Sequence, residues 1–138
     1  MKFSKIITAL LFIMMGCEQP QGFIEPEDPL DAGREFVRAT LDGNFERAAL
    51  YVNNDPEDKD LFVRYENFMK HQPKEIKLQF KSASIIIHNV KNDSDSVSYM
   101  NYSNSYTNKP MDLKIVKQAN KWRVDLSYTF SGNLPVTE

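Results

Sequence analysis

The chain has 138 residues, of which 26% are charged and 12% aromatic, and a formal net charge of −2. This length suits one domain whose core needs neither disulfides nor a metal. The slight acidic excess excludes the basic character expected of a nucleic-acid-binding protein, and the aromatic content excludes a disordered chain. We therefore expect one folded domain without a nucleic-acid partner, and no residue pattern indicates a cofactor.

The chain begins with Lys2 and Lys5, followed by an apolar run over residues 6–15. A positive end, a short apolar stretch and a small closing residue are typical of an export signal. A membrane-spanning helix needs ~20 apolar residues, about twice the length of this run. We predict that residues 1–16 form a signal peptide with Gly16 at the cleavage point, and that its removal makes the chain more acidic.

The stretch Met14-Met15-Gly16-Cys17 resembles a bacterial lipobox, although that motif usually has Leu first and then Ala, Ser or Thr. The resemblance implies that Cys17 receives a diacylglyceryl group and becomes the new N-terminus. It places the protein in the cell envelope, anchored to a membrane outside the cytoplasm, with the outer membrane favoured and the leaflet open. Cys17 is the only cysteine, so its lipidation leaves no thiol for a disulfide. The alternative is a plain secretory signal with a chance cysteine.

Residues 17–28 are rich in proline, glycine and acidic residues, and we predict a flexible tether there, followed by one domain over residues 29–138. The sequences DPLD at 28–31 and DPED at 55–58 each predict a helix start. In both, the aspartate can cap free amides of the first turn, and proline suits the first helical position. Apolar residues at helical spacing then predict three helices, the first ending near Gly43.

From residue 75 onward apolar residues alternate with polar ones, which is the period of a β-strand. The predicted strands contain residues 76–80, 85–87, 97–99, 111–115 and 122–130. The sequence KQANKW joins the last two as a hairpin in which Asn120 can take a positive φ. Helices followed by a strand meander predict an α+β fold, with the helices packed on one face of an antiparallel sheet.

The sequence AGREFVRATLDGNFERAALYV at 32–52 resembles the opening of small cone-shaped domains of the nuclear transport factor 2-like, or cystatin-like, superfamily. The sequence NKWRVDLSY at 120–128 is similar to their closing strand. Many uncharacterised bacterial lipoproteins carry such a domain. The resemblance implies a curved sheet around a long helix, a pocket at the wide end of the cone, and a homodimer through the sheet as an open alternative.

Enzymes of that superfamily place acids, Tyr or His inside the cone, whereas the inward positions here are predicted to hold aliphatic and aromatic residues. Asp112 and Asp125 occupy positions that alternate with the apolar residues of their strands, so they are predicted to face outward. His71 and His88 lack the short spacing of metal ligands, and the acids at 55–60 fit a capped helix start better than a calcium loop. The sequence therefore predicts no catalytic and no metal-binding residue.

The sequence SDSVSYMNYSNSYTNK at 94–109 places Tyr99, Tyr102 and Tyr106 among Ser and Asn. Together with Trp122 they form a candidate surface for a ligand or partner, because these side chains combine large rings with a hydrogen-bonding group. The alternative is an exposed strand and loop with half of its tyrosines in the core. A basic outer face of the last hairpin is predicted to protect a sheet edge or to attract anionic lipid; it comprises Lys114, Lys117, Lys121 and Arg123.

Three functions stay open from the sequence. The favoured one is binding without catalysis, either of a small apolar ligand in the pocket or of an envelope protein on the sheet. The others are an enzyme of hydrolase, isomerase or dehydratase type, and a structural envelope component with a filled cone. A deep apolar pocket would favour binding of a small ligand, and polar residues that converge in a pocket would favour an enzyme. A packed interior with an exposed aromatic sheet would favour binding of a protein partner.

Overall fold

The computed structural model describes residues 23–131, so the predicted signal peptide, Gly16 and Cys17 lie outside the described residues. The elements in chain order are α1 (Pro29–Leu41), α2 (Phe45–Ala49), α3 (Pro56–Lys70), α4 (Lys74–Ser82), β1 (Ile85–Ser94), β2 (Val97–Asn104), β3 (Met111–Gln118), β4 (Lys121–Asp125) and α5 (Leu126–Phe130). The strands form one antiparallel sheet in the order β1-β2-β3-β4. The predicted α+β fold, with N-terminal helices packed against an antiparallel sheet, is confirmed.

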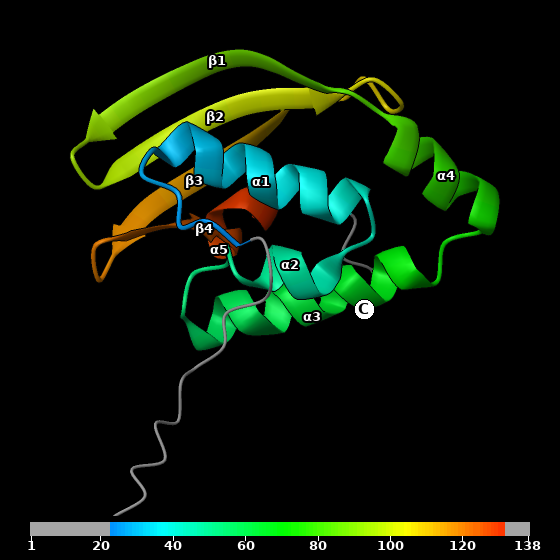
Figure 1. Ribbon diagram of the computed structural model, residues 1–138, viewed down its shortest axis with the longest axis horizontal. Coiled ribbons are helices and arrows are strands. Elements are labelled where there is room, and N and C mark those ends of the chain that lie inside the picture. The colour runs from blue at the N-terminus through cyan, green and yellow to red at the C-terminus, as the bar shows by residue number, and fades with distance from the viewer. Residues whose placement is uncertain (1–22, 132–138) are drawn as a thin grey trace, which may run out of the picture.

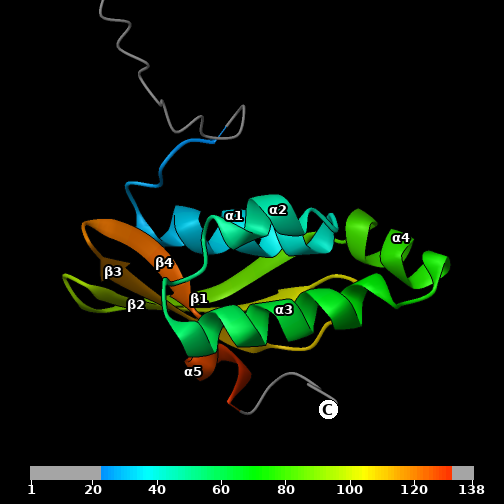
Figure 2. The ribbon, with the colours of Figure 1, turned by 90° about the horizontal axis from the view of Figure 1, so that it is seen from below.

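Helix α1 runs along one face of the sheet and contacts all four strands, while β1 and β2 curve past it (Figure 1). Helix α2 packs on α1, and α3, which also packs on α5, lies next to α2, where the ring of Phe45 contacts those of Phe62 and Tyr65 (Figure 2). Helix α4 lies apart, at the end of the molecule where α1 finishes. The core therefore lies between α1 and the sheet, and α3 and α5 close its open side.

Helix α1 approaches the sheet closely at Gly33, which is buried. A Cβ atom at this position would lie 2.9 Å from Cδ1 of Ile115 and 3.2 Å from Cδ2 of Leu113 and Cε of Met100. These three neighbours are themselves fully buried. The absence of a side chain at Gly33 therefore sets how near the helix lies to β2 and β3.

The predicted helix starts are confirmed. The Asp28 carboxylate accepts a hydrogen bond from the Leu30 amide at 2.7 Å, and the Asp55 carboxylate accepts one from the Glu57 amide at 2.9 Å. The first helix ends before Gly43, whose φ of 73° is a left-handed conformation that suits glycine. The hairpin between β3 and β4 is also as predicted, since Asn120 has a φ of 63°.

The strand predicted over residues 76–80 is wrong, because Lys74–Ser82 form helix α4. The alternating apolar residues do not share a buried sheet face: Phe80 is half-buried, whereas Leu78 is 53% exposed. Glu, Gln and Lys between them have high helix propensity, so local preference favours the helix. The bend expected between this segment and β1 is the end of that helix.

The last strand is shorter than predicted, because β4 ends at Asp125 and Leu126–Phe130 form α5. The Asp125 carboxylate accepts a hydrogen bond from the Tyr128 amide at 3.0 Å and from the Ser127 hydroxyl at 2.8 Å. These bonds cap the first turn of a helix. Leu126 and Phe130 stay buried, although they now point from a helix rather than a strand.

Within the predicted tether, residues 23–28 lie against the domain. The ring of Phe23 packs on that of Tyr51 with centroids 5.5 Å apart, and the Arg123 guanidinium donates to the Glu25 carboxylate at 3.1 Å. The Arg123 hydrogen bond outweighs burial and lowers the pKa of Glu25. In the described part of the chain, no helix has the length and apolar character needed to cross a bilayer.

Candidate ligand-binding cavity

A cavity of about 280 Å³ lies between the C-terminal half of α1, the end of α3, helix α5 and the ends of β2 and β3. Its walls are mostly aromatic and aliphatic; they include Phe36, Val37, Leu41, Tyr65, Phe68, Met69, Phe80, Tyr102, Met111 and Phe130. Helix α1 supplies one wall because its residues 36, 37, 40 and 41 share a face at helical spacing. The amphipathic stripe of α3 supplies the opposite wall.

The polar groups at the cavity are uncharged, apart from Lys109 in the loop at its edge. The hydroxyl of Thr40 donates to the Val37 carbonyl at 2.8 Å. Burial raises the pKa of Tyr65, although a hydrogen bond with Thr40 offsets part of this effect. Burial also raises the pKa of Tyr102, and the neighbouring Tyr65 raises it further. Both phenols therefore stay neutral at physiological pH.

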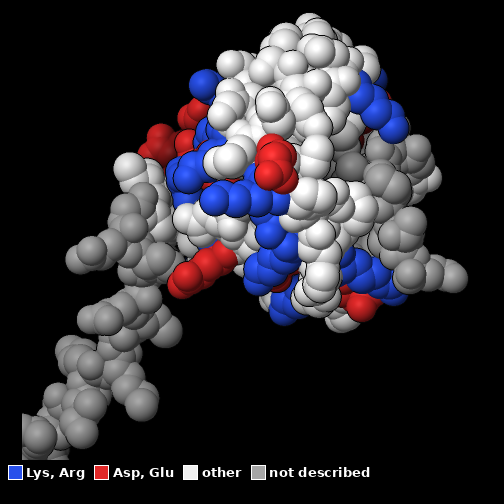
Figure 3. Space-filling view, turned by 90° about the vertical axis from the view of Figure 1, so that its right-hand side faces the viewer, with Lys and Arg blue, Asp and Glu red and all other residues white. Residues whose placement is uncertain are grey.

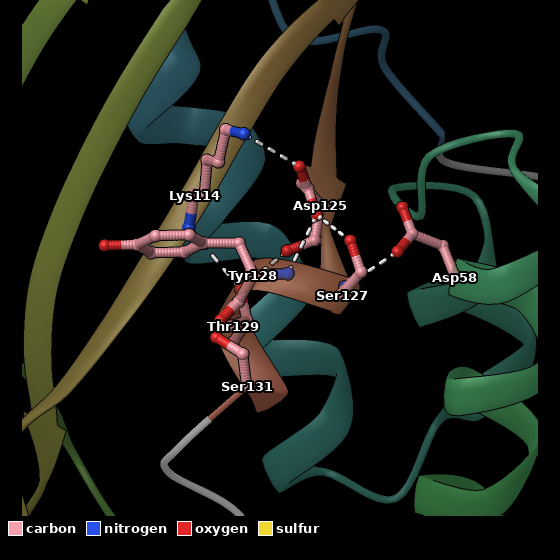
Figure 4. A network of polar contacts seen from close by, with 7 residues as sticks. All are labelled: Asp58, Lys114, Asp125, Ser127, Tyr128, Thr129 and Ser131. Atoms are coloured by element: carbon pink, nitrogen blue, oxygen red, sulfur yellow. Dashed lines mark hydrogen bonds and ion pairs between the residues drawn. The ribbon is translucent and has the colours of Figure 1, made fainter.

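Helix α5 forms part of the cavity wall, and a polar network fixes it (Figure 4). The carboxylate of Asp125 pairs with the Lys114 ammonium at 3.1 Å. The carboxylate of Asp58, which is 1% exposed, accepts from the Ser127 amide at 2.8 Å and so joins α3 to α5. The Thr129 hydroxyl donates to the Asp125 carbonyl at 2.8 Å. These contacts hold Thr129 and Phe130 in place at the cavity.

The pKa values of the two carboxyl groups in this network, Asp58 and Asp125, shift in opposite directions. Burial raises the pKa of Asp58, and the hydrogen bonds from the Ser127 amide and Asn53 offset only part of it. Burial alone would also raise the pKa of Asp125, but its bonds from Tyr128, Ser127 and Lys114 outweigh burial and lower it. The hydrogen bond with Asp125 raises the pKa of Lys114, which agrees with a stable ion pair. Asp125 therefore stabilises the fold in its charged form.

We expect Asp125→Asn to lower the free energy of unfolding by about 1 kcal/mol at pH 7, because the charge is lost while an oxygen remains to cap α5. The folded-state pKa of Asp125 is depressed, so its contribution exists above the unfolded pKa of about 3.9 and disappears as pH falls through the folded value. The difference in the free energy of unfolding between variant and wild type should thus shrink toward zero as the pH falls below the unfolded pKa and through the lower folded one. Urea titrations at several pH values would measure this.

The matched control is Asp112→Asn, since Asp112 is an exposed carboxylate on the neighbouring strand that accepts a hydrogen bond from Asn101. The free energy of unfolding of this control should stay within about 0.5 kcal/mol of the wild-type value at every pH. A constant deficit of Asp125→Asn across the whole pH range would contradict the role of the charge.

Two of the four residues in the candidate aromatic surface are buried. Tyr102 is 8% exposed and lines the cavity, and Trp122 is 7% exposed in the core. The Lys117 ammonium lies 5.4 Å from the centre of the Trp122 ring. Neither residue is available as an outer docking surface.

The other two residues lie in different places. Tyr99 is half-buried on the outer face of the sheet, where its ring packs against Tyr128 with centroids 5.3 Å apart. Tyr106 is 38% exposed in the loop after β2 and packs edge-on against Phe80 of α4 at 5.0 Å. The tyrosine-rich stretch therefore does not form one aromatic patch, and it agrees better with the alternative of a strand and loop.

Two of the four residues in the predicted basic face of the last hairpin form ion pairs within the domain. Lys114 pairs with Asp125, and Arg123 pairs with Glu25. Asp112 and Asp125 lie on the outer face as predicted, although only 15% of the Asp125 side chain is exposed. This face offers less free positive charge than the sequence indicates.

The two histidines have local structural contacts. Nδ1 of His71 lies 2.7 Å from the Asn67 carbonyl at the end of α3, and Nε2 of His88 lies 2.9 Å from the Ser103 hydroxyl. Among residues 23–131, no group of three or more His, Cys, Asp or Glu side chains is arranged to hold a metal ion. The predicted absence of metal and of catalysis stays a prediction.

Sequence reasoning did not identify most of the cavity residues as a site. The spacing of Tyr65, Phe68 and Met69 predicts an apolar helix face that packs against another part of the protein. It does not distinguish a face in the core from the wall of a cavity. Thr129 and Phe130 were assigned to a strand. Comparison with protein-family models, with curated proteins and with solved structures found no significant match to this chain.

Proposed function

We propose that this protein is an exported, lipid-anchored envelope protein whose domain binds a small apolar ligand without catalysis. The observation that carries the binding function is the cavity between α1, α3, α5 and the sheet, with its apolar walls and neutral polar groups. Small-molecule sites are typically concave, mostly apolar and furnished with a few polar groups. The volume of about 280 Å³ lies just below the typical range of about 300–1,000 Å³ and suits a slender ligand.

The chemistry of the cavity also favours binding over catalysis. No Asp, Glu, His or Cys is among the described residues that line it. General acid–base catalysis needs a group that gains or loses a proton near neutral pH, and the raised pKa values of Tyr65 and Tyr102 move these phenols away from that range. The membrane anchor is proposed from the sequence around Cys17, and the homodimer through the sheet stays a prediction.

The test is calorimetric titration with 1-decanol, a neutral single-chain probe. The wild type should bind it, whereas Met111→Trp should bind it at least about tenfold more weakly, which corresponds to about 1.4 kcal/mol. Met111 is half-buried at the cavity wall, so a larger ring can occupy the cavity without entering the packed core.

The control is Val63→Trp, which adds the same ring at a position on α3 that is 52% exposed and does not line the cavity. It should bind 1-decanol like the wild type. Equal binding by all three proteins would show that the probe binds elsewhere, and absence of binding to the wild type would contradict the proposed function.

A further inference from the structure

A second hollow, here called the α4 groove, opens beside the cavity between the ends of α1 and α3 and helix α4. It has a volume of about 270 Å³, and Leu78 of α4 contributes to its wall. The groove shares Thr40, Leu41, Met69 and Phe80 with the cavity. The two hollows are therefore neighbours that share part of their walls.

Three lysines of α4 line this groove: Lys74, Lys77 and Lys81. Their spacing of three and four residues places them on one side of the helix, together with Leu78. Leu78 is 53% exposed, so the same helix face presents positive charge and apolar surface. Figure 3 views this end of the molecule and shows Lys and Arg side chains in a band across it, with fewer acidic ones between them.

The positive charge of these lysines is not neutralised inside the domain. Among residues 23–131, Lys74, Lys77 and Lys81 form no ion pair. Of the described residues that line the groove, Asp42 is the one acid, and it pairs with Arg38 at 2.9 Å.

Helix α4 is held in position by α1. The Arg38 guanidinium donates to the main-chain carbonyl of Lys81 at 3.0 Å and to that of Ala83 at 2.7 Å. These bonds satisfy carbonyl groups at the end of α4, which have no partner within the helix. The edge-on contact of Phe80 with Tyr106 is a second attachment. The lysines are therefore held in the hollow next to the apolar cavity.

We propose that the ligand is a single-chain amphiphile with a carboxylate head, of the fatty-acid class. Its tail would occupy the cavity and its carboxylate would lie among Lys74, Lys77 and Lys81. The shared wall places the tail site and the head site next to each other, and charge complementarity favours an anionic head over a neutral one. This inference rests on the proposed function, because it requires the cavity to hold the tail.

The test compares decanoate with 1-decanol, which have the same chain length but differ in head-group charge. The variant carries Lys74→Gln, Lys77→Gln and Lys81→Gln, which removes the three lysine charges of α4 without adding an acid; Lys70, which also lines the groove, pairs with Glu66 and is kept. By calorimetry at pH 8, it should bind decanoate about tenfold more weakly than the wild type does. Its affinity for 1-decanol should be unchanged, and added salt should weaken only the binding of decanoate.

The matched control carries Lys59→Gln, Lys91→Gln and Lys121→Gln, the same change of net charge at lysines that line neither the cavity nor the α4 groove. It should bind both probes like the wild type. If the groove variant also binds both probes like the wild type, the carboxylate site is wrong while the apolar cavity stands. If the wild type binds neither probe, the proposed function itself fails.

A membrane surface is the competing occupant of the α4 groove. Flotation with vesicles containing anionic phospholipid would test it, using the same groove variant and control. Loss of vesicle binding by the groove variant, with decanoate affinity unchanged, would assign the lysines to membrane docking and overturn the ligand proposal.

Discussion

Replacing Gly33 with leucine should lower the free energy of unfolding by about 2–3 kcal/mol, because a side chain there enters space that the sheet already fills. The first added carbon alone would lie 2.9 Å from Cδ1 of Ile115 and 3.2 Å from Cδ2 of Leu113 and Cε of Met100, and leucine adds further carbons beyond it. Leucine has a better helix propensity than glycine by nearly 1 kcal/mol, so the steric cost must exceed this gain. Urea unfolding monitored by circular dichroism would measure the difference.

Gly43→Ala is the control for this variant, because a substitution at Gly43 should lower stability through backbone strain and not through a steric clash. Gly43 has a φ of 73° and no atom within 4 Å of an added Cβ. Alanine there should cost about 1 kcal/mol through backbone strain alone. It should leave the methyl resonances of Ile115 and Met100 unchanged, whereas Gly33→Leu should shift them. A Gly33→Leu protein as stable as the wild type would contradict the close packing of α1 on the sheet.

If the proposed lipid anchor exists, Cys17→Ala should move the protein almost completely from the membrane fraction to the soluble fraction of the cells that produce it. The proposed anchor consists of acyl chains on Cys17, and each buried CH₂ contributes about 0.8 kcal/mol to membrane binding. Without the thiol there is no site for the diacylglyceryl group. Fractionation followed by immunoblotting would measure the distribution.

The control is Ser105→Ala, a change at an exposed loop position of the folded domain, which should stay in the membrane fraction. The intact mass of the wild-type protein provides an independent reading. It should correspond to a chain that begins at Cys17 and carries acyl groups. An unprocessed chain with a free Cys17 thiol would contradict lipidation.

The helices of the first half were predictable because their signals are local. Asp28 and Asp55 cap their helices through their own side chains, and each is followed by proline, so no distant contact is needed. Gly43 and Asn120 likewise adopt the positive φ values that their residue types favour. The α+β class follows from the order of these segments along the chain.

Helices α4 and α5 were mistaken for strands because short segments satisfy both periodicities. Over nine residues, apolar positions at 76, 78 and 80 look like alternation, although the helix that forms uses mainly Phe80 for contact. In α5, the deciding contacts of Asp125 with Ser127 and Tyr128 are also local, and a cap at that position would have been a usable signal.

The residue pattern does not predict where the cavity lies, because an apolar stripe has the same spacing whether it fills a core or lines a hollow. Its position depends on α5, which closes one side through Asp58 of α3, a contact across many residues of sequence. The lysine face of α4 depends equally on that segment being a helix. As a strand, residues 74, 77 and 81 would not share one face.

The most direct test of the apolar site is to locate a bound probe. Nuclear Overhauser effects would be recorded between 1-decanol and the protein with labelled methionine and isoleucine methyl groups. A chain in the cavity should show contacts to the methyl groups of Met69 and Met111, which lie in its wall. Contacts confined to Ile86 and Ile87, which are exposed on the edge strand β1, would contradict the cavity as the binding site.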